Sequence, residues 1–545
     1  MVSYEEMYGN FSWEFPEKFN FAGDVVDRWA EQEPELKALF WVDDDGNEKS
    51  RTYAQMSLIS QKLCNFLTGL GVERGDVLII MLGREIEWWE ICTASLRMGA
   101  ILSPGTTQMT AKDIEYRINR AEATCFISTE AHAAKLEAVA EQCPTLKARV
   151  IIGAERDGWA NYEAGLAAAA DEFETADTAG DEDAICYFTS GTTGYPKMAL
   201  HTHTSYPLGH ITTGTYWLNL KPGDLHWNIS DTGWAKAAWS SYFGPWNCGA
   251  TVFVHQTKAF NAAKTLSLLQ RYPIQTLCGP PTVYRMLVLQ DLSQYRFPHL
   301  GHCISAGEPL NPEVIQTWHK ATDIIIRDGY GQTETVILCG SFLNIEPRYG
   351  SMGKPAPGID LQVVDNEGQI APPNQEGDIA VRVHPNRPLG LFKEYWKDPE
   401  RTAATRKGDW YITGDRAYVD EDGYFWFVGR ADDVILSAGY RIGPFEVESA
   451  LIEHPAVAES AVVASPDEVR GAVVKAFVIL TPGYKGHDPS TSSGHRALVK
   501  ELQDHVKAVT APYKYPRKIE FVDALPKTIS GKIRRVELRA REQNK

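Results

Sequence analysis

The chain has 545 residues, of which 43% are hydrophobic, so it can bury a large core and form about three or four domain-sized units. The 54 basic and 71 acidic side chains leave a formal net charge of −17, which argues against a nucleic-acid partner. No apolar run is long enough to span a membrane, and the densest basic segment, 527–541, is typical of a solvated helix face.

Cysteine usage and the N-terminus bear on the cellular compartment. The nine cysteines are scattered singly, several of them in apolar runs, and no Cys-x-x-Cys pair occurs. This pattern predicts buried, reduced thiols rather than a zinc site or a disulfide framework. Residues 1–7 have neither a basic start before an apolar core nor an Arg-rich transit character. We therefore expect a cytoplasmic protein.

Helix and strand patterns alternate through the first part of the chain. Thr52 precedes a helical pattern as a capping residue, and residues 75–81, which end in five consecutive apolar residues, are typical of a buried strand. Shorter apolar runs follow at 125–127 and 150–152, and residues 161–183 indicate a helix and an acidic linker. The alternation predicts layered sheets with helices on their faces.

A loop rich in glycine and hydroxyl groups follows the apolar run 184–188. Glycines let backbone N–H groups turn toward an anion, hydroxyls add donors, and the final lysine adds a positive charge. A plain turn is the alternative, but nine such residues after a strand favour a polyphosphate cradle. The lysine is not followed by Ser or Thr, so this is not a Walker-type loop. The loop reads Thr189, Ser190, Gly191, Thr192, Thr193, Gly194, Tyr195, Pro196, Lys197.

The predicted secondary structure changes in the last third of the chain. A helix is expected to begin at Asn311-Pro312, and after Ser351 shorter strands with Gly and Pro turns predict a small β-rich subdomain. Beyond Arg430 a compact α/β pattern follows. It contains helices at about 445–453 and 496–509, strands at 458–464 and 473–480, and a polar loop at 486–495. We place a boundary near Asp432.

The expected fold is α/β. Residues 1–431 would form a large N-terminal domain of layered α/β subdomains with the β-rich subdomain, and residues 432–545 a small, mobile α+β C-terminal domain.

Further blocks follow the loop 189–197 in a fixed order: Ser305–Leu310, Asp328–Glu334, Thr413–Asp415, Gly429–Val434 and Pro526–Lys532. Together they resemble, over nearly the whole chain, the adenylate-forming superfamily of acyl-CoA synthetases, luciferases and peptide-synthetase adenylation domains. Three other segments are most similar to the medium-chain acyl-CoA synthetases: Ile229–Trp234, Gly439–Pro444 and Thr510–Lys518.

The resemblance implies a ligase that joins a carboxylic acid to AMP and then to coenzyme A. A carboxylate is a poor acyl donor, and transfer to the α-phosphate of ATP gives it a leaving group. ATP, Mg²⁺ and coenzyme A are the implied cofactors and co-substrates. Two alternatives stay open: an aryl-acid or carrier-protein adenylating enzyme, and a nucleotide-binding regulator without chemistry.

The resemblance also assigns an ATP site. Asp415 would accept hydrogen bonds from the ribose, Tyr330 would stack on adenine, and Glu334 would hold Mg²⁺. Otherwise Asp415 would be an ordinary turn residue. The implied ATP-binding residues are Thr189, Ser190, Gly191, Thr192, Thr193, Gly194, Lys197, Gly307, Glu308, Pro309, Asp328, Gly329, Tyr330, Gly331, Gln332, Thr333, Asp415 and Arg430.

Catalysis and thiol transfer are implied to depend on the C-terminal domain. Lys532 would stabilise the attack of the acid on the α-phosphate, and Arg441 would reach the phosphates. Asp432 would be the hinge about which this domain turns between the two half-reactions. The implied CoA-binding residues are Gln108, Ala438, Gly439, Tyr440, Arg470, Lys507 and Arg517.

Three residues bear on the acid. Acetyl-CoA synthetases carry tryptophan where this chain has Gly331, so an acid larger than acetate should fit. Val336 replaces a glycine that is usual in close relatives, which either narrows the pocket or favours a branched or ring-bearing acid. Trp234 is either a pocket aromatic or a core residue.

Overall fold

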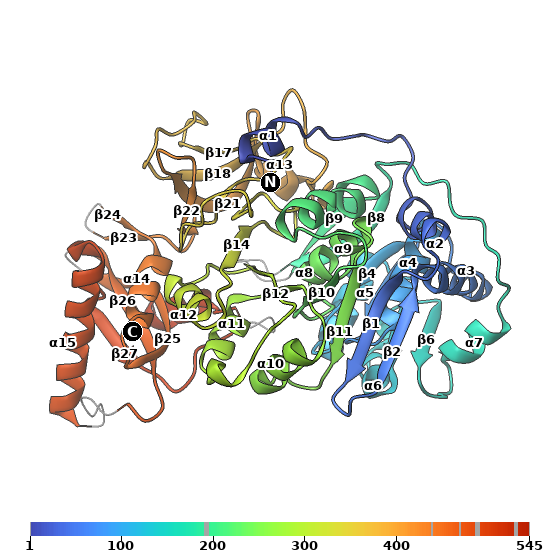
Figure 1. The fold of residues 1–545 in the computed structure, drawn as a ribbon, viewed down its shortest axis with the longest axis horizontal. Coiled ribbons are helices and arrows are strands. Elements are labelled where there is room, and N and C mark those ends of the chain that lie inside the picture. Colours follow the sequence, from blue (N-terminus) through green and yellow to red (C-terminus); the bar gives the residue numbers. More distant parts are fainter. Residues whose placement is uncertain are drawn as a thin grey trace.

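The computed structural model describes residues 2–189, 196–437, 440–467, 470–484, 491–527 and 532–543; for residues 441 and 492 only the backbone is described. Two large sheets covered by helices form most of the molecule, a smaller sheet lies above them in Figure 1, and the C-terminal part forms one end. This arrangement confirms the expected α/β class, with a large N-terminal and a smaller C-terminal part.

The first large sheet carries the strand that leads into the glycine-rich loop. It is parallel from β8 to β7, and β9 and β19 extend it in antiparallel fashion. Every side chain of β3 is buried, as expected for a central strand covered on both faces. In spatial order its strands are β19 (Glu394–Tyr395), β9 (Lys197–Thr202), β8 (Asp183–Thr189), β4 (Ile101–Pro104), β3 (Val77–Met81), β5 (Cys125–Thr129), β6 (Ala148–Ile152) and β7 (Ala160–Asn161).

The second large sheet is parallel from β14 to β1, with antiparallel strands at both edges. Its strands in spatial order are β16 (Lys354–Pro355), β15 (Cys339–Gly340), β14 (Ile326–Tyr330), β13 (His302–Ala306), β12 (Thr276–Gly279), β10 (Leu225–Asn228), β11 (Thr251–Gln256), β1 (Lys37–Asp43) and β2 (Glu48–Thr52).

Helices cover these two sheets. Thr52 caps α3 through a reciprocal pair of hydrogen bonds with Gln55, as the sequence predicts. Asn311 precedes α12, but its side chain makes no capping bond. The helices are α2 (Arg28–Gln32), α3 (Tyr53–Gly69), α4 (Glu87–Arg97), α5 (Ala111–Ala121), α6 (Glu130–Glu137), α7 (Tyr162–Ala168), α8 (Ala235–Ala238), α9 (Gly244–Asn247), α10 (Ala262–Arg271), α11 (Pro281–Val288) and α12 (Pro312–Thr322). Short π- and 3₁₀-helical turns are η1 (Ala22–Asp27), η2 (Ala140–Gln142), η3 (Thr204–Leu208), η4 (Thr213–Trp217), η5 (Trp239–Phe243) and η6 (Leu292–Gln294).

The β-rich subdomain predicted after Ser351 is present. The N-terminal helix α1 (Tyr4–Gly9) lies beside this part, where the Tyr4 and Tyr8 hydroxyls each donate a 2.9 Å hydrogen bond, to the carbonyls of Pro355 and Ile359 (Figure 1). Its strands are β17 (Leu361–Val364), β18 (Gly377–Arg382), β20 (Arg406–Lys407), β21 (Trp410–Val419) and β22 (Phe425–Arg430), and its helix is α13 (Pro399–Ala404).

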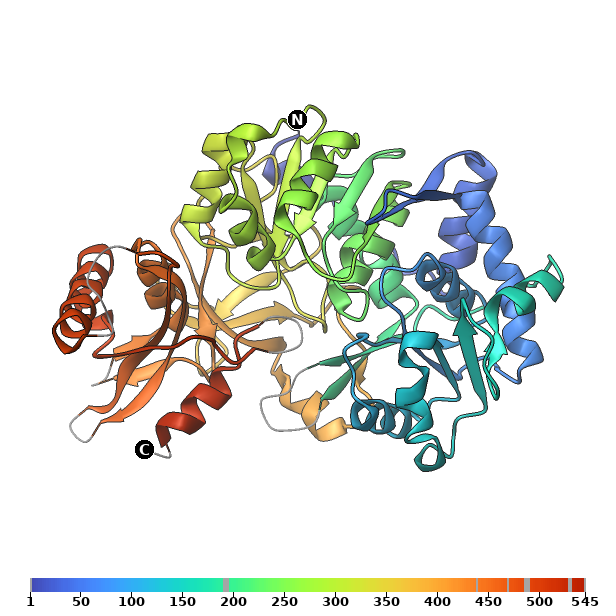
Figure 2. The same cartoon turned by 90° about the horizontal axis from the view of Figure 1, so that it is seen from below.

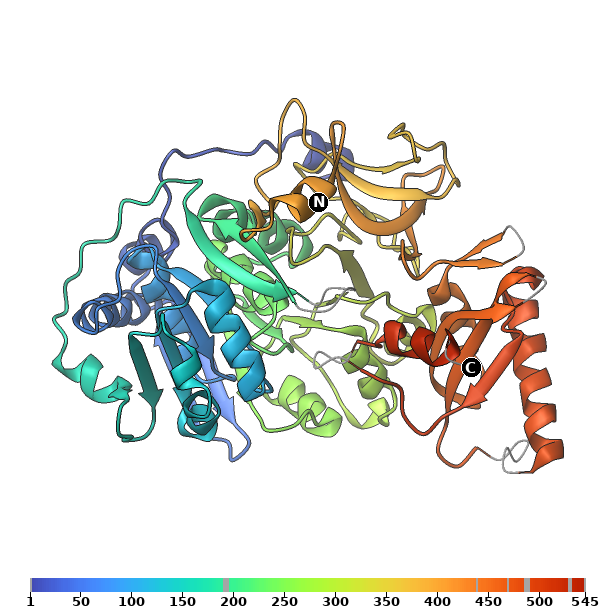
Figure 3. The ribbon, with the colours of Figure 1, turned by 180° about the vertical axis from the view of Figure 1, so that it is seen from behind.

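The C-terminal part has a hydrophobic core of its own, built around Val447, Val462, Ala476, Leu498 and Leu502. Figures 2 and 3 show α15 on its outer flank and α16 on the side nearer the large sheets. Its elements are β23 (Ile435–Ser437), β24 (Tyr440–Ile442), α14 (Pro444–Ile452), β25 (Val457–Asp467), β26 (Gly471–Leu480), α15 (Ser492–Val509), η7 (Pro512–Lys514), β27 (Lys518–Phe521) and α16 (Arg535–Gln543).

Two expectations for this part need correction. The polar loop 486–495 is shorter than predicted, because α15 begins at residue 492 with Thr491 as its cap; residues 485–490 lie outside the described residues. The basic segment is not a purely solvated face either. Arg535 of α16 pairs at 2.7 Å with the buried Glu448, and Arg539 pairs with Asp433.

Candidate active site

Strand pairing brings two of the sequence blocks together. Neighbouring parallel strands β13 and β14 place Ser305 beside Asp328 and Ala306 beside Gly329. The carboxyl ends of parallel strands meet at one edge of a sheet, where open α/β folds bind their ligands. Gly307–Pro309 and Gly331–Thr333 therefore follow the ends of these two strands at the same edge of the sheet.

Asp415 is the centre of the site. It lies on β21 directly opposite Arg430 on β22, with Arg430 Nε 3.8 Å from Asp415 Oδ1. Asp415 Oδ2 accepts hydrogen bonds of 2.7 Å from both Tyr330 Oη and Gln332 Nε2. Three predicted nucleotide-binding residues thus meet on one carboxylate.

The electrostatics of Asp415 include the predicted catalytic lysine. Burial raises the pKa of Asp415 above its ordinary value, while the charge of Arg430, the hydrogen bonds from Tyr330 and Gln332, and the charge of Lys532 oppose this. The charge of Lys532, from near the end of the chain, therefore acts on the site where the ribose is expected.

Asp328 is the other buried carboxyl group in this region. Burial raises its pKa to about 7, although backbone N–H groups of Gly329 and Leu310 and the charge of Lys236 lower it. Its Oδ1 accepts a 2.9 Å hydrogen bond from the Gly329 N–H. Asp328 thus anchors the start of the segment 328–333 to the backbone.

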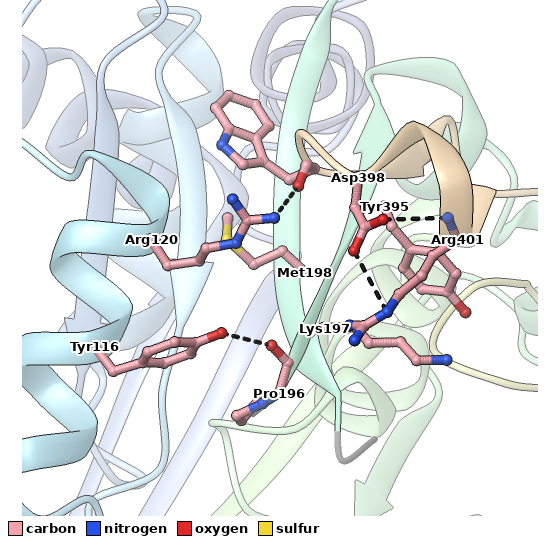
Figure 4. Close-up of a pocket in the computed structure, with 9 residues that line it drawn as sticks. Tyr116, Arg120, Pro196, Lys197, Met198, Tyr395, Asp398 and Arg401 are labelled. Atoms are coloured by element: carbon pink, nitrogen blue, oxygen red, sulfur yellow. Dashed lines mark hydrogen bonds and ion pairs between the residues drawn. The ribbon is translucent and has the colours of Figure 1, made fainter. Parts of the chain in front are cut away.

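Glu334, the predicted metal ligand, is held by Tyr395. Tyr395 Oη donates a 2.8 Å hydrogen bond to Glu334 Oε1, and the Phe392 N–H donates a 2.8 Å bond to the Glu334 carbonyl. Lys197 Nζ lies over the Tyr395 ring, 4.8 Å from its centroid (Figure 4). Glu334, Tyr395 and Lys197 therefore form one connected group.

The loop at Gly307 connects the site to the C-terminal part. Gly307 has φ +107°, a conformation that side chains other than glycine rarely adopt. Glu308 Oε2 lies 3.3 Å from Arg285 Nη2 on α11. Asn311 Nδ2 donates a 3.1 Å hydrogen bond to Ser449 Oγ on α14. Its Oδ1, the atom that would cap α12, instead accepts a 3.4 Å hydrogen bond from Arg285 Nη1.

Trp239 occupies the space beside Gly331. A Cβ atom on Gly331 would lie 2.3 Å from Trp239 Cη2 and 2.5 Å from the Val336 carbonyl oxygen. Trp239 Nε1 donates a 2.6 Å hydrogen bond to Tyr206 Oη, which fixes the indole in place. The structure thus supplies, from η5, an aromatic side chain where the sequence suggested an opening.

Val336 and Trp234 differ in burial. Val336 is fully buried, and a Cβ atom on Gly390 would lie 2.2 Å from its Cγ2. Val336 therefore fits only because residue 390 has no side chain. Trp234 is half-buried and precedes α8. The acyl-pocket roles of both residues stay predictions.

The CoA candidates fall in separate places. Lys507 and Arg517 flank the Tyr515 ring, at 4.3 Å and 4.9 Å from its centroid. Tyr440 is 52% exposed and stacks on Tyr513 with 4.4 Å between ring centroids. Arg470 is exposed near the start of β26, and Gln108 is exposed in the loop after β4 of the N-terminal part.

The hinge candidate Asp432 is tied to α16. Arg539 Nη1 donates a 3.2 Å hydrogen bond to the Asp432 carbonyl and pairs with the Asp433 carboxylate. Arg430 Nε lies 3.9 Å from Asp432 Oδ1. The boundary at residues 431 and 432 stays a prediction.

Some predicted residues lie outside the described residues: Ser190, Gly191, Thr192, Thr193, Gly194, Ala438 and Gly439. The Arg441 backbone lies in β24, and its side chain is not among those described.

The sequence reasoning missed Tyr395, Trp239 and His201. His201 Nε2 lies 2.8 Å from the Thr333 carbonyl, so this nitrogen carries the proton, and burial lowers the pKa of His201 to about 3. A neutral His201 therefore holds the Thr333 backbone. None of the three lies in the blocks that carried the resemblance.

No helix within the described ranges combines the length and apolarity needed to cross a membrane. Among the same residues, no three His, Cys, Asp or Glu side chains cluster as ligands for a metal ion.

Two family models match the chain. The AMP-binding enzyme model matches residues 26–396, and the AMP-binding enzyme C-terminal domain model matches residues 446–532.

Curated relatives match over almost the full length. The mitochondrial acyl-coenzyme A synthetase ACSM3 of Mus musculus is 51% identical over 99% of this chain and 93% of its own length. The mitochondrial ACSM4 of Homo sapiens is 50% identical over 97% of this chain and 91% of its own. The prediction of a cytoplasmic protein is wrong by this comparison, because these relatives are named mitochondrial.

Solved structures share the fold. The anthranilate CoA ligase AuaEII in complex with anthranoyl-AMP has a TM-score of 0.88 and 31% identity, covering 97% of this chain and 98% of its own. The acyl-CoA synthetase of Brucella canis has a TM-score of 0.76 and 33% identity, covering 100% of this chain and 99% of its own. The chain therefore belongs to the AMP-binding enzyme family and, within it, to the acyl-CoA synthetases.

Proposed function

We propose that this enzyme uses ATP to activate a carboxylic acid larger than acetate and then transfers the acyl group to coenzyme A at the same site. The observation that supports this most directly is the environment of Asp415. This carboxylate accepts hydrogen bonds from Tyr330 and Gln332 and is acted on by the charge of Lys532. It is therefore suited to bind a ribose beside the reacting α-phosphate.

In the first step, the oxygen of the acid attacks the α-phosphorus of ATP and pyrophosphate leaves. Lys532 stabilises the negative charge that develops between acid and phosphate, an effect on the order of 10² to 10³ in rate for one well-placed donor. Asp415 and Arg430 hold the ribose side of the nucleotide.

Glu334 is the candidate for holding Mg²⁺. Tyr395 donates to its Oε1, and carboxylate oxygens are the hard ligands that Mg²⁺ prefers. The donor set fits Mg²⁺, which usually takes one or two protein carboxylates together with phosphate oxygens. When bound, the ion would neutralise charge on the phosphates.

In the second step, the thiol of coenzyme A displaces AMP from the acyl group. Tyr440 stacked on Tyr513 offers an aromatic face, and Lys507 and Arg517 beside Tyr515 offer positive charge; both features suit a nucleotide with several phosphates. These residues are candidates for the CoA site.

The acid is proposed to be medium-chain, branched or ring-bearing. One structural neighbour is named an anthranilate CoA ligase, and another is named a benzoate CoA ligase of Burkholderia xenovorans LB400 at 26% identity. These names support a ring-bearing acid. Trp239 and Val336 are both buried beside Gly331, next to the expected site.

A panel of carboxylic acids from acetate to decanoate, with benzoate and branched acids, tests the proposal by ATP-dependent AMP release with and without coenzyme A. We expect the highest kcat/KM for an acid larger than acetate, with turnover dependent on coenzyme A. Turnover that needs a phosphopantetheinylated carrier protein instead would favour the adenylating-enzyme alternative. If the enzyme incorporates no labelled pyrophosphate into ATP with any acid of the panel, the proposed ligase activity is refuted.

A further inference from the structure

A polar cavity of about 270 Å³ lies beside Lys197 and is lined in part by Tyr395 (Figure 4). Three cations, Arg120, Lys197 and Arg401, line it together with one carboxylate, Asp398. The side chains come from α5, β9 and α13, so three segments far apart in sequence build one site.

The charged groups are held in position. Arg120 Nη2 donates a 2.7 Å hydrogen bond to the Trp396 carbonyl, and Arg401 Nε lies 3.5 Å from Asp398 Oδ2. Tyr116 Oη donates a 3.1 Å hydrogen bond to the Pro196 carbonyl, which fixes the wall that precedes Lys197. With three positive charges against one negative charge, the cavity is suited to an anion with several oxygens.

Tyr395 connects this cavity to the reaction. Its ring lines the cavity under Lys197 Nζ, while its hydroxyl donates to Glu334 Oε1. Strand pairing enforces this position, because Tyr395 on β19 lies opposite Ala199 on β9, two residues after Lys197. The buried Tyr395 is therefore shared between the phosphate lysine and the carboxylate proposed to hold Mg²⁺.

We propose that this cavity receives the inorganic pyrophosphate released by adenylation, with Tyr395 as the positioning residue that couples it to Glu334. The inference rests on the proposed function. In that step the carboxylate oxygen bonds to the α-phosphorus and the bond from that phosphorus to the β-bridging oxygen breaks. The electron pair stays on pyrophosphate, whose added charge Arg120 and Arg401 neutralise.

Direct binding to the full-length enzyme tests the cavity. Isothermal titration with pyrophosphate would compare the wild type with Arg401→Gln and Lys393→Gln. The two side chains are matched: each is 42% exposed and pairs with one aspartate, Arg401 with Asp398 and Lys393 with Asp183, but Lys393 does not line the cavity. We expect Arg401→Gln to weaken pyrophosphate binding about tenfold and Lys393→Gln to leave it unchanged. Equal affinities for all three proteins, or no binding by the wild type, would overturn the proposal.

Orthophosphate and adenosine 3′,5′-bisphosphate, the nucleotide end of coenzyme A, serve as competing anions. Pyrophosphate should bind more tightly than either of these anions. In Arg401→Gln the affinity for pyrophosphate should fall, and the affinities for the other two anions should not. A larger loss for the bisphosphate would assign the cavity to coenzyme A and overturn the inference. If Arg401→Gln fails to fold by circular dichroism, Arg120→Gln gives the same comparison.

The role of Tyr395 is tested with Tyr395→Phe, which keeps the ring over the cavity and removes the hydroxyl. We expect a higher KM for pyrophosphate in ATP–pyrophosphate exchange and weaker Mg²⁺-dependent ATP binding by titration, with an unchanged KM for the acid. A fall in kcat with the KM for pyrophosphate and the affinity for ATP both unchanged would contradict a positioning role. The wild type could bind pyrophosphate and still show no ATP–pyrophosphate exchange with any acid tested. In that case the proposed function fails, while the assignment of the cavity to pyrophosphate is retained.

Discussion

The Tyr330 hydroxyl donates a 2.7 Å hydrogen bond to Asp415, 85 positions later in the chain. Gln332 donates to the same oxygen, and the Tyr411 hydroxyl donates a 3.2 Å hydrogen bond to Gln332 Oε1. The carboxylate proposed to bind the ribose is therefore oriented by neighbours before any nucleotide arrives. This preorganisation reduces the ordering that binding requires.

Tyr330→Phe tests that orientation. Removing one charge-assisted hydrogen bond should raise the KM for ATP about tenfold, since such bonds contribute about 1.5–3 kcal/mol, while the KM for the acid stays unchanged. Steady-state kinetics with ATP and acid varied in turn measure this. Tyr349→Phe is the control, because its hydroxyl contacts His319 Nδ1 at 3.2 Å instead. A similar KM for ATP in both variants would contradict the orienting role of Tyr330.

Lys532→Ala separates the two half-reactions. Adenylate formation should fall by about 10² to 10³, because the positive charge beside the reacting α-phosphate is lost. Thioester formation from supplied acyl-adenylate and coenzyme A should be largely retained. Lys527→Ala is the matched control, since Lys527 pairs with Glu459 at 2.8 Å. An equal loss in both half-reactions would contradict the role given to Lys532.

Trp239→Phe tests the wall beside Gly331. A smaller ring should shift kcat/KM toward bulkier acids by about tenfold, since methylene-sized changes in an apolar pocket alter discrimination by roughly 1–3 kcal/mol. Trp246→Phe is the control, because Trp246 is also buried but its indole donates to the Ala38 carbonyl at 3.2 Å. If kcat/KM depends on acid size in the same way in both variants, Trp239 is a core residue and not a wall of the acid pocket.

Asp328→Asn should change how stability depends on pH. Burial raises the folded-state pKa of Asp328 to about 7 from an ordinary 3.8. Between these values the unfolded chain loses its proton first, so the wild type loses stability as pH rises from about 4 to 7. The loss is at most about 4 kcal/mol, at 1.36 kcal/mol per pH unit.

Thermal unfolding midpoints from pH 4 to 7 check this expectation. The amide can still accept from the Gly329 N–H but does not ionise, so the midpoint of the variant should decline less with pH. The exposed Asp45 gives a control, and Asp45→Asn should follow the wild type. Identical slopes for Asp328→Asn and the wild type would contradict the raised pKa.

Local signals in the sequence predicted much of the fold. Thr52 and Gln55 are three residues apart, and the apolar run of β3 is continuous, so each can be read without knowing the tertiary structure. The pairing of Asp415 with Arg430 also follows from a local hairpin, β21 and β22. The sequence blocks thus name residues that meet in the structure, and their nucleotide-binding roles stay predictions.

The residues that sequence reasoning missed depend on long-range packing. Tyr395 reaches Glu334 because β19 joins the edge of a sheet whose next strand is about 200 residues earlier. Trp239 reaches Gly331 from η5, and no local pattern connects the two. Gly331 alone indicated an opening, since a glycine does not reveal which distant side chain fills its space.

The contact of Arg539 with the Asp432 carbonyl and the Asp433 carboxylate ties α16 to the residues at which the C-terminal domain is predicted to begin. The ion pair between Lys475 and Glu542 fastens the same helix to the sheet of the C-terminal part. At the predicted hinge Asp432, a backbone rotation would then carry Lys532 along with this connected unit, so that a small change in torsion angle gives a large displacement of the lysine.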